Sequence, residues 1–129
     1  LRQTEGEVGQ VAADTTAMDQ LARLTHRVFS VRTAVLKHVM AQDKATKGQL
    51  DSEIAQLDQE IGQILDEWEA GDPSGKYRGV REQLASAWAA YVETRDNVAL
   101  AASRRSASRR STTRSPRHAG RSEHRLKHR

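Results

Sequence analysis

The chain has 129 residues, 36% of them hydrophobic and 29% charged, which is typical of one helix-rich domain. Only 4% are aromatic and eight are glycine, which disfavours a fold of many short strands. The absence of cysteine excludes disulfides, thiolate metal sites and cysteine nucleophiles. Residues 103–129 hold nine arginines, one lysine and one glutamate, a charge of +9, so the net +4 leaves −5 for residues 1–102.

The first expected helix covers about residues 11–42. Its apolar side chains recur at alternating steps of three and four residues, a seam that packs on another helix. The seam consists of Leu21, Leu24, Val28, Val31 and Val35. Toward the end of the helix the stripe widens with Phe29, Leu36, Val39 and Met40. We therefore expect this helix to touch more than one neighbour, and residues 43–48 to form a turn between antiparallel helices.

A second helix is expected at about residues 49–70, where the apolar spacing is the most regular in the chain. Its seam consists of Leu50, Ile54, Leu57, Ile61, Ile64 and Trp68. The helix should stop at Gly71, because Asp72-Pro73 cannot continue it. Ser74 can then cap the third helix.

The third helix is expected at about residues 76–102. Its inward stripe comprises Tyr77, Val80, Leu84, Trp88, Tyr91 and Val98. Residues 103–129 contain one leucine and no aromatic residue, so they cannot bury a core and are predicted to be a disordered Arg/Ser-rich tail. The predicted fold class is all-α, an elongated antiparallel bundle of three long helices.

Three long helices are one short of the common four-helix bundle, so the first and third helices should need a cover. A fourth helix or a second copy of the chain would supply it, and we expect a homodimer through the first helix. The chain begins with Leu1 rather than Met, which suggests a fragment. No stretch approaches the ~20 apolar residues that span a bilayer, so the fragment is expected to be soluble.

No catalytic motif or phosphate-binding loop occurs, so we expect no enzyme activity, no cofactor and no metal. His26 and His38 lie twelve residues apart, which misses the i, i+4 spacing of a shared metal, and each is expected to be half-buried. His124 and His128 have that spacing, but they lie in the tail that is predicted to be disordered, so a metal role is not expected. The carboxylates of the second helix are interpreted as a solvated face.

Arginines on the first helix are the candidate ligand residues. Arg23, Arg27 and Arg32 could present planar, bidentate donors to a small anionic molecule, with surface ion pairing as the alternative. The basic tail could instead bind nucleic acid or an anionic membrane through counterion release, but without stacking aromatics it should show no sequence specificity. Its abrupt Arg/Ser composition also resembles an out-of-frame translation of a GC-rich gene.

Residues 18–102 resemble the four-helix-bundle ligand-binding domain of methyl-accepting chemotaxis proteins. The resemblance rests on the run VFSVRTAVLKHVMAQD, the run LDSEIAQLDQEIGQILDEWEA, and WAAYVETRDNVALAAS with its Trp88, Tyr91, Arg95 and Asp96. Sensor modules of histidine kinases and cyclic-nucleotide enzymes share such patterns.

The resemblance implies a dimeric, periplasmic sensor in the inner membrane, held between two membrane helices and signalling by small helix shifts. It also implies ligand contacts from Arg27 and Arg32. The membrane helices, the fourth helix, the HAMP linker and the kinase-coupling hairpin of that family are missing from this sequence. The expected function is a non-enzymatic ligand-sensing module of a chemoreceptor-type transducer. The alternative is a helical interaction protein whose Arg-rich tail binds nucleic acid or acidic partners.

Overall fold

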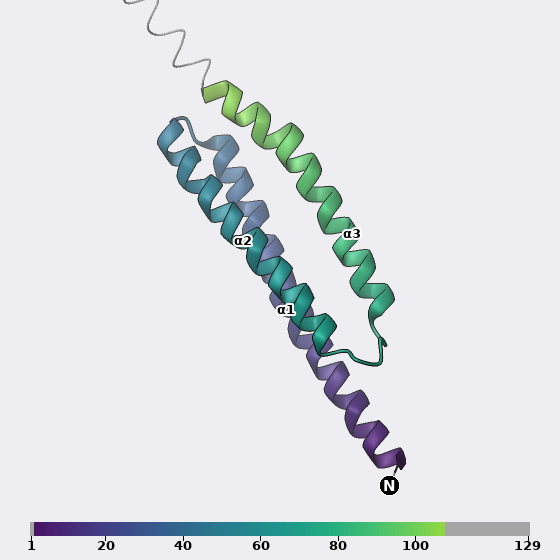
Figure 1. Cartoon of the computed structure of the whole chain (residues 1–129). Helices are drawn as coiled ribbons and strands as arrows, with labels where there is room; N and C mark the ends of the chain where they lie inside the picture. The colour runs from purple at the N-terminus through teal and green to yellow at the C-terminus, as the bar shows by residue number, and fades with distance from the viewer. Residues whose placement is uncertain (1, 108–129) are drawn as a thin grey trace, which may run out of the picture.

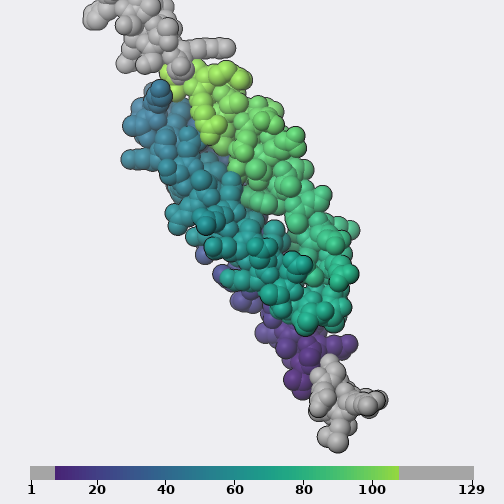
Figure 2. Space-filling model, viewed as in Figure 1, coloured from purple at the N-terminus to yellow at the C-terminus, as the bar shows by residue number. Residues whose placement is uncertain are grey.

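A computed structural model of the chain describes residues 2–107, with side chains from Val8 onward. Helix α1 spans Arg2–Met40, α2 spans Lys44–Ala70 and α3 spans Arg78–Thr94. A π-helical segment, η1, follows α3 directly at Arg95–Leu100, and residues 101–107 are again α-helical. Successive helices run antiparallel in an elongated bundle (Figures 1 and 2), and the described residues contain no strand. The predicted all-α bundle is confirmed. The expected disorder of residues 108–129 lies outside the described residues.

The connection between α1 and α2 is shorter than the sequence indicated. Helix α2 begins at Lys44 rather than near residue 49, so the predicted turn over residues 43–48 is wrong for all but its first residue. Asp43 caps the helix, because its carboxylate accepts a hydrogen bond from the Thr46 backbone N–H at 2.9 Å and another from the Thr46 hydroxyl. This cap lets the helix start within three residues of the end of α1. Helix α1 also begins earlier than expected, at Arg2 rather than near residue 11.

The core lies mainly between α1 and α2. One cluster joins Leu24 and Val31 of α1 to Ile61 and Ile64 of α2, and a second joins Ala34, Leu50, Ile54 and Leu100. These positions confirm the predicted seams of both helices. Leu21 is the exception on α1, because nearly half of its surface stays exposed.

The turn between α2 and α3 is organised by Asp72, whose side chain is fully buried. Its carboxylate accepts hydrogen bonds from the backbone N–H groups of Lys76 and Tyr77 at 3.1 and 2.9 Å. The expectation that Ser74 would cap the third helix is wrong, because α3 begins at Arg78 with Tyr77 at the N-cap position and no side chain within the described residues caps it. Gly75 adopts a φ of 73°, a left-handed conformation that glycine allows without strain.

The third helical segment changes register at η1. Leu84, Trp88 and Tyr91 pack against the core as predicted, but Val80 and Val98 are exposed, at 49% and 62%. Their placement on the inward stripe was therefore wrong. For Val98 the reason is the π-helical segment, which inserts an extra residue into the turn. The helix also continues to residue 107, so residues 103–107 belong to the bundle rather than to a tail.

Candidate functional site

Arg27 and Arg32, the two predicted ligand residues, lie in different surroundings. The Arg27 Nε atom lies 2.9 Å from Glu60 Oε2 of α2, and both side chains are about one-third exposed. Arg23 likewise pairs with Glu67 of α2 at 2.8 Å. Surface ion pairing, the alternative interpretation, therefore describes Arg23 and Arg27.

Arg32 is exposed on the surface of α1. It is within electrostatic reach of the Tyr91 hydroxyl. Burial raises the pKa of Tyr91 above its ordinary value, and the charges of Arg95 and Arg32 offset part of this rise. Five residues apart on an α-helix, Arg27 and Arg32 point about 140° apart. The structure therefore does not bring the two arginines together in one chain.

A second apolar seam runs along the outside of α1. We call it the outer stripe and define it by Val8, Val11, Met18, Phe29, Leu36 and Val39, all exposed, with Thr15, Ala22, Thr25 and Arg32 between them. Consecutive members are separated by alternating steps of three and four residues, the spacing of a coiled-coil seam. Met18 is 75% exposed and Phe29 is 69% exposed. Helix α1 therefore carries two seams, of which the described chain covers only the inner one.

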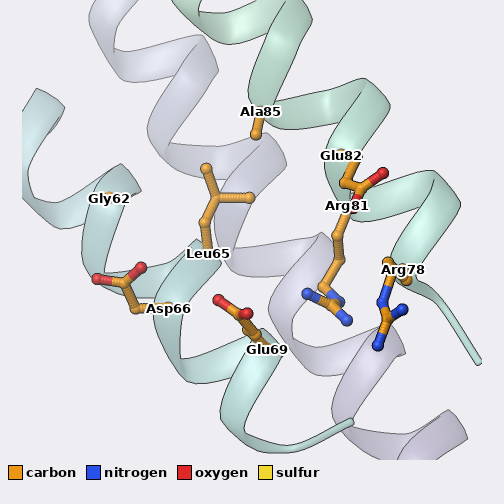
Figure 3. A pocket seen from close by; sticks show the side chains of 8 residues that line it. All are labelled: Gly62, Leu65, Asp66, Glu69, Arg78, Arg81, Glu82 and Ala85. Atoms are coloured by element: carbon orange, nitrogen blue, oxygen red, sulfur yellow. The ribbon is translucent and has the colours of Figure 1, made fainter. Parts of the chain in front are cut away.

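A groove of about 350 Å³ lies between α2 and α3, near their connecting turn (Figure 3). Asp66 and Glu69 project from α2 on one side, and Arg78 and Arg81 project from α3 on the other. Arg81 is tied to the buried Asp72 at 3.2 Å rather than to the acidic residues across the groove. The opposing charges would suit a polar molecule, but no further feature of the groove selects one.

A buried polar cluster closes the end of the bundle where α1 meets α2. His38 is fully buried, with Nδ1 2.8 Å from Ser103 Oγ and Nε2 2.9 Å from Asp51 Oδ1. Lys47 Nζ donates to the His38 carbonyl oxygen at 2.9 Å and to Ser103 Oγ at 2.5 Å. The Ser103 hydroxyl lies 3.0 Å from the same carbonyl oxygen. The cluster thus fastens residues 101–107 to both other helices.

This cluster was not predicted from the sequence, and both histidines were expected to be half-buried. His38 is fully buried and His26 is exposed, so that expectation was wrong for both. Lys47 was hidden because residues 43–48 were assigned to a turn. Its spacing of three residues from Leu50 and seven from Ile54 places it on the inward seam, which is the signal that could have revealed it.

Arg95 anchors the start of η1. Its guanidinium makes two parallel hydrogen bonds to the Asp58 carboxylate, at 2.8 and 2.7 Å, and a third to Asp96 at 3.0 Å. These bonds raise the pKa of Arg95 above its ordinary value, chiefly through Asp58, so the residue keeps its charge although it is buried. A buried, fully paired arginine at this point fixes the position of the third helix on α2.

Within residues 2–107, no group of His, Asp or Glu side chains is arranged to hold a metal ion. None of the helices in this part of the chain combines the length and apolar character of a membrane span. The fold therefore defines the protein only as an all-α helical bundle with an uncovered seam. Comparison with known proteins adds no family, because no family model, curated protein or solved structure matches the chain.

Proposed function

We propose that the chain is a non-enzymatic ligand-sensing module of the chemoreceptor type. It pairs with a second copy along the outer stripe of α1 and takes a small anionic ligand at Arg32. The observation that carries the proposal is the outer stripe, because a soluble monomer rarely exposes a long apolar surface. In this proposal the module stands on the periplasmic side of the inner membrane, within a longer transducer.

The outer stripe suits a second copy of the same helix. In a parallel coiled coil each seam residue packs against its counterpart in the partner, so Met18, Phe29 and Leu36 would each meet an identical apolar side chain. Two copies anchored in one membrane enter it from the same side, which requires the parallel arrangement. A two-fold pair through one helix is also the commonest form of oligomer.

Arg32 is the one charged residue of the outer stripe, and it gives the pairing its ligand dependence. In the parallel pair the two Arg32 guanidinium groups would face each other across the seam, and like charges at that distance repel. An anion with two carboxylates would bridge them through charge-assisted, bidentate hydrogen bonds. The ligand would then favour the dimer. Arg27 would reach the same anion only by leaving Glu60.

Sedimentation of the full chain with and without succinate tests the proposal. We expect a dimer at micromolar concentration that tightens with succinate and not with acetate, which has a single carboxylate. Arg32→Leu should tighten the dimer by about tenfold without succinate and abolish its response, because the repulsion is replaced by apolar packing. Arg23→Leu removes a charge from another face of α1 and serves as the matched control. A wild-type chain that stays monomeric at high micromolar concentration would refute the proposal.

The orientation of the two copies can be tested separately by oxidative cross-linking, since the chain has no native cysteine. In a parallel pair Thr15→Cys should cross-link to its counterpart as readily as Thr25→Cys. In an antiparallel pair centred near Thr25, residue 15 would lie tens of ångströms from its counterpart and only Thr25→Cys would react. That second result would contradict a membrane-anchored sensor while leaving self-association intact.

A further inference from the structure

The third helical segment faces the bundle in two different registers. Up to η1 its packed positions follow α-helical steps of three or four residues, from Leu84 through Trp88 and Tyr91 to Arg95. The next buried position is Leu100, five residues on. Beyond it the steps return to three and four. The π turn thus carries one extra residue, the usual form of a π-bulge.

A regular α-helix through the same residues would present another face. Without the extra residue, each inward position after Arg95 passes to the residue before it, so Ala102 would replace Ser103, with Val98 facing inward as well. Both residues are exposed in the structure, Val98 at 62%. The alternative face carries Val98, Ala99 and Ala102, with Ser106 at its end, and the predicted inward stripe included Val98. The segment therefore carries two usable faces.

The observed register is held by a small set of contacts from Leu100, the last residue of η1, onward. Leu100 is 1% exposed in the second core cluster, and Ser103 hydrogen-bonds with His38 and Lys47. Arg95, on the other side of the extra residue, keeps its pair with Asp58 in either register. For the segment to turn, Leu100, the Ser103 hydroxyl and the buried Ala107 must be released, together with the exposed Arg104–Asp51 ion pair, while the upstream helix stays in place.

We infer that η1 is a register switch, which lets residues 101–107 move between the observed π-bulged register and a regular α-helical one. In the second register they rotate by about 100° and shift by about 1.5 Å relative to α3. A discrete change between two packings is a common form of conformational signalling. The inference goes beyond the proposed sensor, because it rests only on the contacts of η1 and residues 101–107 and needs no ligand.

Cysteine labelling on the full chain tests the switch. Ala102→Cys reports an exposed position that becomes buried in the second register, and Ala107→Cys reports a buried position that becomes exposed. In the otherwise wild-type chain we expect Cys at 102 to react quickly with a maleimide and Cys at 107 slowly. Adding Leu100→Ala should reverse this, slowing the reaction at 102 and speeding that at 107 by about tenfold each.

The reciprocal pattern separates a register change from simple fraying. If Leu100→Ala speeds labelling at both positions, the helix end is unwinding and the inference is overturned. Unchanged rates at both positions overturn it as well, because they show a single register. Ser103→Ala provides a milder second variant with the same expected direction, should circular dichroism show that Leu100→Ala loses the fold.

A one-residue deletion provides the control. Removing Asn97 takes out the extra residue, so a regular α-helix then leads directly into the observed contacts of Leu100 and Ser103. In this background Leu100→Ala should no longer protect Cys at 102, because the second register has been abolished. Protection that persists in the deletion variant would show that η1 has no part in the movement.

Discussion

The two halves of the third helix are held to the bundle in contrasting ways. Residues 78–94 contain the aromatic side chains Trp88 and Tyr91, yet no residue among them is fully buried. Residues 95–107 contain no aromatic side chain and include three arginines and two serines, and they bury Arg95, Leu100, Ser103 and Ala107. Which residues of the third helix are buried depends on the hydrogen-bond and packing partners that α1 and α2 provide. A polar group can be buried at low cost once its hydrogen bonds are made.

Three ion pairs along the third helix make the contrast testable, because their exposure differs. Arg81–Asp72 lies at the start, Arg95–Asp58 at η1 and Arg104–Asp51 near the end. An ion pair contributes more when it is desolvated and well bonded than when water competes with it. Removing them one at a time should therefore give graded effects.

The largest effect is expected from Arg95→Ala. Arg95 is 3% exposed and its partner Asp58 is 28% exposed, so the substitution leaves a carboxylate partly buried without its bidentate partner. We expect the free energy of unfolding to fall by about 3 kcal/mol, measured by urea denaturation followed by circular dichroism. Arg95→Lys keeps the charge but not the two parallel hydrogen bonds, so its free energy of unfolding should lie between those of the wild type and Arg95→Ala. A loss below about 1 kcal/mol would mean that apolar contacts alone hold the second half.

A smaller, pH-dependent effect is expected from Asp72→Asn. Burial raises the pKa of Asp72, but hydrogen bonds from the Tyr77 and Lys76 backbone and the charge of Arg81 outweigh it, so the pKa lies below its ordinary value of 3.8. A lowered carboxyl pKa contributes stability above the unfolded-state pKa, and this stability is lost as pH falls through the folded-state value. The wild-type protein should therefore be more stable than Asp72→Asn by a constant free energy of unfolding above about pH 5. This difference in stability should shrink below about pH 4.

Thermal unfolding of both proteins between pH 2 and pH 7 measures this margin. Asp19→Asn is a suitable control, because it removes one carboxylate from an exposed position on α1, away from this turn. A margin that stays constant down to pH 2 would show that the Asp72 charge is unimportant and that its side chain acts only as a neutral cap.

The apolar seams were predictable because they depend on periodicity alone. Ile54, Ile61 and Trp68 lie where the spacing placed them, since a helix that packs on another must repeat its apolar residues. Val98 was misplaced because a π turn shifts every later position by one residue, and no local pattern of residues marks such a turn. The end of the third helix was also not predicted. Residues 103–107 are rich in arginine and serine, a composition that indicates a disordered tail unless the partners of these residues are known.

The candidate site was only partly predictable. Sequence alone identified the arginines of α1 but could not tell which were engaged, because Glu60 and Glu67 come close to Arg27 and Arg23 only once α2 folds back. The polar cluster was even harder to predict, because His38, Lys47 and Ser103 are spread over 65 positions of sequence. Such clusters depend on tertiary packing, whereas the outer stripe can be recognised in the sequence by its spacing.

The smallest effect is expected from Arg104→Ala, at the end of the same helix. Arg104 and Asp51 are 49% and 35% exposed, so water and salt compete with their contact at 2.8 Å. We expect a loss of about 0.5 kcal/mol, which 1 M salt should remove. The Asp51 pKa, which burial raises but Arg104 and His38 lower to below its ordinary value, should rise in the variant, as NMR titration would detect. A loss as large as that of Arg95→Ala would show that the end of the helix is fastened mainly by charge. The contrast between the two halves would then lie in ion pairing rather than in Leu100 and Ser103.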